Sequence, residues 1–301
     1  MNNLIEQAAL RLEQLRQAGA EVAATPIGTQ SIEHDAQVHL IEPQQAAFSR
    51  RVEIDMEALT KAGIVSPTAP RSQIADQFRV IKRPLIKNAV GKGASAIKNG
   101  NLILITSALP GEGKSFTAIN LALSMATEMD NTVMLVDADV ARPSVMNMLG
   151  LSSGPGLLDL VCDESKDLSS MLLKTNIDKL TILPSGTPHA RATELLASDA
   201  MSRLLNDMAT RYSDRIIIFD SPPLLLTTEA RVLASHMGQI VVVVRAEKTL
   251  QADLRQALAT IDACPVKLLL LNQVRSRFNW GYGYGYGYGN SYGYGYAQQQ
   301  A

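Results

Sequence analysis

The chain has 301 residues, of which 46% are apolar and 19% are charged, and this is enough for one substantial α/β core with extensions. A formal net charge of -1 argues against a protein that binds nucleic acid through a broad basic surface, because neutralising phosphates requires an excess of lysine and arginine. No apolar run reaches the roughly 18 to 20 residues of a membrane span, and the N-terminus lacks a signal-peptide pattern, so we expect a cytoplasmic protein.

The first predicted element is an amphipathic helix over residues 1–18. Apolar side chains recur there at helical spacing, with glutamate and arginine at the remaining positions. Such a helix can pack on the protein's own core, on a partner or on a membrane surface, and its mixed charges favour the membrane least. Residues 19–70 show no sustained period and are interpreted as a linker that wraps the core.

Short apolar runs bounded by turn residues predict the strands of a core domain over residues 71–277. Runs that are apolar on both faces are typical of a buried parallel sheet. Helical patterns fall between them, so we expect a doubly wound, mostly parallel α/β domain with its functional residues at the carboxyl ends of the strands. The predicted strands are residues 102–106, 133–136, 180–183, 216–219, 240–244 and 268–271, and the main predicted helices are residues 115–129, 193–212 and 249–263.

A phosphate-binding loop follows the first of these strands. Residues 107–117 read Ser-Ala-Leu-Pro-Gly-Glu-Gly-Lys-Ser-Phe-Thr and lead into a helix-forming run. In such a loop, glycines let backbone N–H groups surround phosphate oxygens, Lys114 neutralises the β- and γ-phosphates, and the Ser115 hydroxyl binds Mg²⁺. The usual pattern begins with glycine, whereas this chain has Ala108 at that position. The residues expected to bind nucleotide are Gly111, Glu112, Gly113, Lys114, Ser115 and Phe116.

Two later strand ends carry acidic residues. Asp137 and Asp139 follow one strand, and Asp220 ends another before two prolines. Asp220 fits the carboxylate on the Mg²⁺ side of a P-loop enzyme, and Asp137 is a second candidate near the same metal. One of the acid pair can accept the proton of an incoming hydroxyl group, although a helix-capping role is the alternative for one of them. The catalytic candidates are therefore Lys114, Asp137, Asp139 and Asp220, and the metal candidates are Ser115, Asp137 and Asp220.

The C-terminal segment, residues 278–301, is rich in glycine and tyrosine and holds seven of the eight tyrosines of the chain. Glycine gives this segment high backbone entropy and little surface to bury, so we expect it to stay extended and accessible. Each phosphotyrosine adds roughly -1.5 to -2 charges, so full phosphorylation changes a nearly neutral tail into a strongly acidic one. The expected phosphorylation sites are Tyr282, Tyr284, Tyr286, Tyr288, Tyr292, Tyr294 and Tyr296.

With these motifs the chain resembles the bacterial tyrosine-kinase (BY-kinase) family of exopolysaccharide and capsule biosynthesis. The resemblance rests on the loop at residues 110–115, the acid pair Asp137 and Asp139, the Phe-Asp-Ser-Pro-Pro run at residues 219–223 and the tyrosine tail. It implies an ATP-dependent autokinase with the architecture of the MinD and ParA ATPases. The N-terminal helix and the sequence around Asp137 look most similar to the exosortase-associated subgroup.

The resemblance also implies the partners. Kinases of the family form rings, phosphorylate one another's tails in trans and work with a membrane polysaccharide co-polymerase, and a tyrosine phosphatase resets them. The protein is then cytoplasmic and held at the inner membrane through its partner. The ring-forming helix of the family is matched here by Asp76, Arg79 and Lys82, which keep its charge signs, so we expect self-association. No nucleic acid is expected as a partner.

Two alternatives remain. Alternating glycine and tyrosine can self-associate without phosphorylation, which would make the protein an ATP-gated scaffold. Septum-placing and plasmid-partition ATPases share the expected fold, but their loop carries an extra lysine where this chain has Leu109. No guanine-reading Asn-Lys-x-Asp motif follows the late strands, so ATP is the expected nucleotide. Covalent phosphate on the tail distinguishes the kinase from both alternatives.

Overall fold

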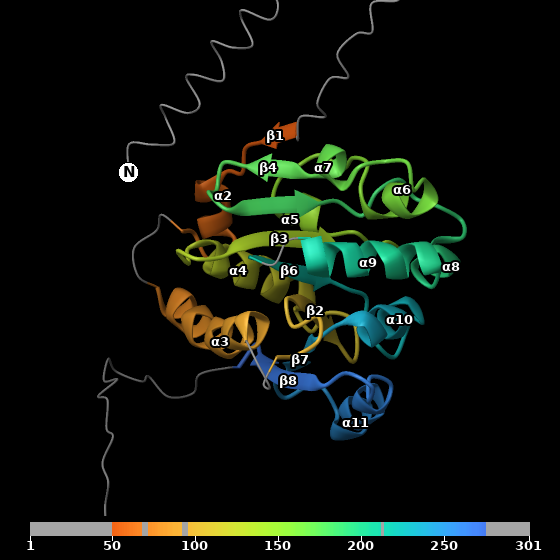
Figure 1. Ribbon diagram of the computed structural model, residues 1–301. Helices are drawn as coiled ribbons and strands as arrows, with labels where there is room; N and C mark the ends of the chain where they lie inside the picture. The colour runs from red at the N-terminus through yellow and green to blue at the C-terminus, as the bar shows by residue number, and fades with distance from the viewer. Residues whose placement is uncertain (1–49, 68–71, 92–95, 212–213, 275–301) are drawn as a thin grey trace, which may run out of the picture. The chain divides into compact units, whose positions relative to one another are not determined.

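The computed structural model describes residues 50–67, 72–91, 96–211 and 214–274. The strands in this part of the chain form one sheet in the order β1-β4-β5-β3-β6-β2-β7-β8 (Figure 1). Their bounds are β1 (Arg50–Val52), β2 (Leu102–Ser107), β3 (Thr132–Asp137), β4 (Leu173–Thr175), β5 (Leu180–Leu183), β6 (Arg215–Asp220), β7 (Gln239–Arg245) and β8 (Val266–Asn272).

Neighbouring strands are parallel except β4 and β5, which are antiparallel, so β1 and β4 run opposite to the other strands. The expected doubly wound, mostly parallel sheet is confirmed. The helices between the strands are α2 (Met56–Lys61), α3 (Gln73–Val90), α4 (Lys114–Ala126), α5 (Val145–Met148), α6 (Leu157–Cys162), α7 (Leu168–Met171), α8 (Ala192–Leu196), α9 (Asp199–Arg211), α10 (Glu229–His236) and α11 (Gln251–Ala259).

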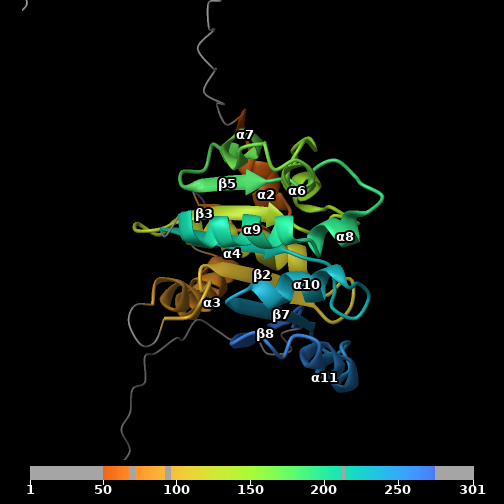
Figure 2. The same ribbon diagram turned by 45° about the vertical axis from the view of Figure 1, so that its right-hand side comes forward.

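The central strands are buried on both faces, as their uninterrupted apolar runs predict. In β2, Leu102 and Leu104 pack into the core on one face, and Ile103 and Ile105 pack into the core on the other. The first core also contains residues of α6 to α11, and the second contains residues of α2 to α5. Figure 2 shows α8, α9 and α10 along the same side of the sheet. Helices therefore cover both faces, as a doubly wound fold requires.

Helix α4 packs against both the sheet and α3, and residues 117–126 of α4 are all buried. The C-terminal end of α4 is bound by Lys82 of α3. The Lys82 ammonium group donates to the carbonyl of Ser124 and, at 3.2 Å, to the Thr127 hydroxyl, and it lies 2.7 Å from a carboxylate oxygen of Glu128. A cation at this place satisfies carbonyls that the helix leaves unpaired and complements the helix dipole. Because α4 begins at Lys114, the same helix carries the phosphate-loop lysine at its other end.

Several element boundaries differ from the sequence prediction. The helix expected over residues 193–212 is divided into α8 and α9, because the Ser198 hydroxyl accepts the N–H of Met201 and donates to the carbonyl of Leu195. A serine that bonds to backbone on both sides favours a helix start over a helix interior. Residues 50–61, interpreted from sequence as part of a wrapping linker, contain β1 and α2. The predicted N-terminal helix and the tyrosine tail lie outside the described residues.

Candidate nucleotide and phosphoryl-transfer site

The loop between β2 and α4 has the backbone shape that phosphate binding needs. Gly111 and Gly113 have φ angles of 77° and 95°, in the region that favours glycine. A side chain at Gly113 would also place its Cβ 2.1 Å from the Nδ2 atom of Asn272, at the end of β8. Helix α4 begins at Lys114, so the loop presents the N-terminal end of a long buried helix to any bound anion.

The order of the strands brings the acidic residues to this loop. Strands β2, β6 and β3 are neighbours, and in their register Asp220 pairs with Ile105 on one side and with Asp137 on the other. Asp137 and Asp220 are both fully buried, and Asp139 is 5% exposed. Asp220 therefore meets Asp137 and Asp139, which come from a distant part of the sequence, at the carboxyl edge of the sheet, as expected for functional residues of this fold.

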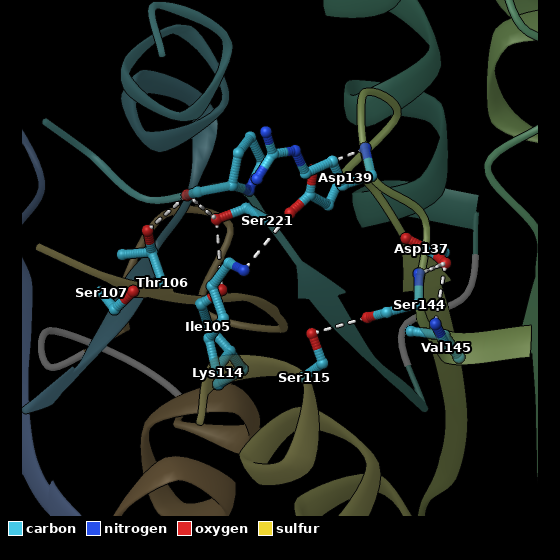
Figure 3. A network of polar contacts seen from close by, with 12 residues as sticks. Ile105, Thr106, Ser107, Lys114, Ser115, Asp137, Asp139, Ser144, Val145 and Ser221 are labelled. Atoms are coloured by element: carbon cyan, nitrogen blue, oxygen red, sulfur yellow. Dashed lines mark hydrogen bonds and ion pairs between the residues drawn. The ribbon is translucent and has the colours of Figure 1, made fainter. Parts of the chain in front are cut away.

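Lys114 and Ser115 are already bonded to this acidic group (Figure 3). The Nζ atom of Lys114 lies 3.3 Å from the Oδ2 atom of Asp139. The hydroxyls of Ser115 and Ser144 lie 2.8 Å apart, and the N–H groups of Ser144 and Val145 donate to the Oδ2 atom of Asp137 at 3.1 and 3.0 Å. Ser144 links the serine of the loop to the end of β3. It was not anticipated from the sequence.

The two acids after β3 also bond to nearby backbone N–H groups. Oδ2 of Asp137 accepts from the first turn of α5, and Oδ1 of Asp139 accepts the N–H of Arg142 at 3.1 Å. The Asp137 contact at the start of α5 is the one that the capping alternative expects, whereas the Asp139 contact closes a turn outside the helices, and each occupies one oxygen of its carboxylate. The other oxygen of Asp139 faces Lys114, and Oδ1 of Asp137 is buried with no hydrogen-bond partner among the described residues.

Burial changes the titration of two of these acids. Loss of solvent raises the pKa of Asp137 to about 6, and the N–H of Val145 opposes this rise while the charge of Asp139 adds to it. Loss of solvent raises the pKa of Asp220 to about 7, and the Ser115 hydroxyl opposes the rise while the charge of Asp137 adds to it. A neighbouring cation would favour the ionised forms of both.

The arrangement of these acids fits Mg²⁺. Both carboxylate oxygens of Asp220 and one of Asp137 are buried without a hydrogen bond of ordinary geometry, and the Ser115 hydroxyl lies beside them. Buried carboxylate oxygens without donors are suited to a hard cation. The described residues contain no cluster of three or more His, Cys, Asp or Glu side chains that could hold a metal by themselves. The usual Mg²⁺ site of P-loop enzymes has few protein ligands and takes the others from phosphates and water.

The side chains of two further predicted nucleotide-binding residues, Glu112 and Phe116, are packed or hydrogen-bonded within the protein. The Glu112 side chain is 3% exposed and is held by protein groups, and Phe116, in the first turn of α4, packs against the hydrophobic core. Two further residues, Asn272 and Thr249, contact the loop. Asn272 Nδ2 donates to the carbonyl of Glu112 at 2.9 Å, and the Thr249 hydroxyl donates to the Glu112 carboxylate. Thr249 was missed in the sequence because it lies 137 positions from Glu112.

The residues predicted for self-association differ in their exposure. Asp76 and Arg79 are exposed and form an ion pair with each other at 2.5 Å, one turn apart on α3. Lys82 is 3% exposed and its charge is used inside the subunit, against α4 and Glu128. The part of α3 that is open to a partner therefore includes Asp76 and Arg79, whereas Lys82 is a structural contact.

A groove of about 690 Å³ lies at the opposite edge of the sheet from the phosphate loop. It is lined by residues at the amino ends of β3, β5 and β6, together with Arg51 and Lys174 from the reversed strands β1 and β4. The candidate nucleotide site, at the carboxyl ends of the strands and the N-terminus of α4, does not coincide with this groove.

Comparison with known proteins agrees with the motifs. The family model for an AAA domain matches residues 100–272, more than half of the chain. The tyrosine-protein kinase YwqD of Bacillus subtilis is 31% identical over 206 residues, which cover 68% of this chain and 83% of that protein. The chain belongs to the bacterial tyrosine-kinase family. Its place in the exosortase-associated subgroup stays a prediction.

Other relatives differ in length. A tyrosine-protein kinase of Acinetobacter johnsonii is 33% identical over 203 residues, which make up 67% of this chain but only 27% of that protein. Among solved structures, the chimerical protein CapA2B2 is 26% identical with a TM-score of 0.58, covering 74% of this chain and 93% of that chain. The kinase domain of VpsO is 26% identical with a TM-score of 0.56, covering 67% of this chain and 96% of that chain. The kinase fold thus occurs both in chains of similar length and as part of longer ones.

Proposed function

We propose that this protein is an ATP-dependent protein-tyrosine autokinase that phosphorylates its own C-terminal tyrosine cluster in trans. The observation that carries the proposal is the meeting of a phosphate loop with three buried aspartates in a chain that also holds seven tyrosines in its tail. Family membership supports the same reading, because the relatives are named as tyrosine-protein kinases.

The structure supports distinct roles for the charged residues. Lys114 lies at the start of α4, where it can exchange its contact with Asp139 for the β- and γ-phosphates of ATP. Asp137 and Asp220 are direct neighbours in the strand register, and between them they hold three buried carboxylate oxygens without a hydrogen bond of ordinary geometry. We therefore assign both acids, together with Ser115, to the Mg²⁺ site. Mg²⁺, when bound, neutralises charge on the phosphates. Asp139 then loses its lysine partner and becomes available as a proton acceptor.

In the reaction, the phenolic oxygen of a tail tyrosine bonds to the γ-phosphorus while the bond from that phosphorus to the β,γ-bridging oxygen breaks. ADP leaves with the electron pair, and the phenolic proton passes to Asp139. Most of the rate enhancement in such transfers comes from positioning and charge stabilisation, and proton acceptance adds about 10²- to 10⁴-fold. The backbone of the glycine loop and the N-terminus of α4 supply fixed positive ends of dipoles for that charge.

The family resemblance extends the proposal to assembly and pathway. We propose that the exposed pair Asp76 and Arg79 takes part in a transient ring of subunits. The proposed setting is exopolysaccharide polymerisation or export at the inner membrane, with a membrane co-polymerase as partner and a tyrosine phosphatase that resets the tail. In the described part of the chain, no helix is both long enough and apolar enough to cross a membrane.

The proposal is tested by incubating the protein with Mg-ATP labelled at the γ-phosphate and with membranes from the source cells. We expect label on tyrosine in the wild type and none in Lys114→Ala. Asp139→Asn should still bind Mg-ATP but transfer phosphate about 10² times more slowly or worse, since it lacks the proton acceptor. ATP hydrolysis by the wild type without tyrosine labelling would support the ATP-gated scaffold instead.

A further inference from the structure

A carboxylate in the phosphate loop itself needs an explanation. Glu112 stands between the two glycines that shape the loop, where a negative charge would oppose bound phosphates. Its side chain is 3% exposed. Oε2 of Glu112 accepts the N–H of Leu109 at 2.9 Å, and Oε1 accepts the hydroxyl of Thr249. The charge is thus held inside the protein by two donors.

Thr249 is itself held in place by a second hydrogen bond. Its hydroxyl oxygen accepts the N–H of Arg245 at 3.0 Å, while its hydroxyl proton goes to Glu112. This uses the threonine hydroxyl as donor and acceptor at once. Thr249 lies in the loop between β7 and α11, a different part of the fold from the phosphate loop.

Asn272 holds the same stretch of backbone from β8. Its Nδ2 atom donates to the carbonyl of Glu112 at 2.9 Å and lies against the Cα of Gly113, where any added Cβ would collide with it. The carbonyl of Asn272 accepts the N–H of Ala246 at 2.9 Å, so β8 and the loop after β7 are joined to each other as well. Gln273 adds a longer contact, 3.3 Å from its Nε2 to the carbonyl of Gly111.

We infer that Thr249 and Asn272 are positioning residues for nucleotide binding: Thr249 holds the Glu112 carboxylate turned away from the phosphate cradle, and Asn272 holds the loop backbone at the Glu112 carbonyl. The inference rests on the proposed nucleotide site and deepens it. Without the Thr249 hydroxyl, Oε1 of Glu112 loses its hydrogen-bond donor, so nothing offsets the free-energy cost of keeping this carboxylate oxygen buried. A released carboxylate repels the phosphates of Mg-ATP at close range, in a partly buried site where water screens little.

The test is a double-mutant cycle that uses the affinity of the full-length protein for a fluorescent Mg-ATP analogue. We expect Thr249→Val, which keeps the shape but lacks the hydroxyl, to weaken binding about tenfold. Thr249→Ser keeps the hydroxyl and should bind within about twofold of wild type. Glu112→Gln alone completes the cycle, and adding it to Thr249→Val removes the charge and should restore most of the lost affinity. The matched control is Thr260→Val, which deletes a hydroxyl at the other end of α11.

A purely structural role for Thr249 is distinguished from positioning by measuring thermal unfolding together with the affinity for the nucleotide analogue. Thr249→Val leaves the N–H of Arg245 without its partner, so the midpoint of thermal unfolding without nucleotide should fall in the single and the double variant alike. Affinity that recovers in the double variant while the midpoint stays low identifies positioning. Wild-type affinity in Thr249→Val, or losses that add in the double variant, would overturn the inference.

The outcomes separate this inference from the proposed function. The cycle measures binding and does not require phosphate transfer. If the cycle behaves as expected and the tail is never phosphorylated, the autokinase proposal fails and the positioning role stands. If the wild type phosphorylates its tail and Thr249→Val binds Mg-ATP normally, only the positioning role fails. A wild type that does not bind Mg-ATP would overturn both.

Discussion

Asp220 makes the protein without nucleotide less stable as pH rises, and replacing it with asparagine should remove that effect. The Asp220 carboxyl group is fully buried, and burial raises its pKa from 3.8 to about 7. A raised pKa in the folded state means that its contribution to stability is complete below pH 4 and is lost as pH rises through about 7. The wild type without Mg²⁺ and nucleotide should therefore lose stability between pH 5 and pH 8.

The size of the effect follows from the pKa change. Since one pKa unit corresponds to about 1.4 kcal/mol, ionised Asp220 costs the folded state at most about 4 kcal/mol at pH 8. A buried asparagine amide without partners costs about 1–3 kcal/mol, so the net gain of Asp220→Asn at pH 8 is about 2 kcal/mol. For a domain of this size that raises the unfolding midpoint by about 4–8 °C. At pH 5 the buried acid is neutral but the unfolded one is ionised, which already costs the folded state about 1.6 kcal/mol, so the wild type and Asp220→Asn should differ by less than about 1 kcal/mol.

The assay is urea or thermal unfolding at pH 5 and pH 8 in the presence of a chelator. Asp130→Asn is the matched control, because Asp130 is exposed in the turn after α4 and its change should stay within about 0.5 kcal/mol. Added Mg-ATP should stabilise the wild type at pH 8 and leave Asp220→Asn unchanged, since that variant lacks a proposed metal ligand. Equal pH dependence in wild type and variant, or a less stable variant at pH 8, would refute the reasoning.

Three further outcomes follow from the structure. Lys82→Met should destabilise the protein by about 2–3 kcal/mol in urea unfolding, because it removes the charged donor to the buried Ser124 carbonyl together with the ion pair to Glu128. Arg79→Ala, in an exposed pair, should cost under about 0.5 kcal/mol, and similar costs would contradict the assignment of Lys82 as a structural contact. Gly113→Ala should abolish Mg-ATP binding in titration calorimetry, because its φ of 95° and the contact with Asn272 exclude a Cβ; retained affinity would show that the loop relaxes freely. The affinity for Mg-ATP should rise between pH 5.5 and pH 7.5, as the two buried carboxylates with raised pKa values lose their protons, and a pH-independent affinity in the same titration would argue against them as metal ligands.

The central strands could be predicted because their signal is local. Runs such as residues 216–219 are apolar throughout, and only a sheet covered on both faces buries them completely. Strands β1 and β4 have three residues each, and β1 begins with two arginines, so no periodicity marks them. When β1 pairs with β4, Arg51 lies opposite Lys174, and no local sequence pattern predicts this pairing of two strands. The break between α8 and α9 depends on which backbone groups Ser198 contacts, and helical spacing alone carries no such information.

The residues of the candidate site also fall into two groups, those that the local sequence marks and those that it does not. Lys114, Ser115 and the strand-end aspartates could be found because a short motif or a strand terminus marks each of them. The bond from Thr249 to Glu112 and the bridge from Ser144 to Ser115 join residues 137 and 29 positions apart, and they exist only after the sheet has formed. Lys82 shows a further limit, since the spacing of charges on α3 does not reveal which charges face inward.

The central claim is tested most directly by the mass of the tyrosine tail. No lysine or arginine follows Arg277, so trypsin releases residues 278–301 as one peptide with seven tyrosines. The protein and its Lys114→Ala variant are incubated with Mg-ATP and membranes from the source cells, with and without added phosphatase. An autokinase predicts a ladder of added phosphates in the wild type that phosphatase removes and that the variant lacks. A tail that stays unmodified in both, while the wild type hydrolyses ATP, would contradict the account.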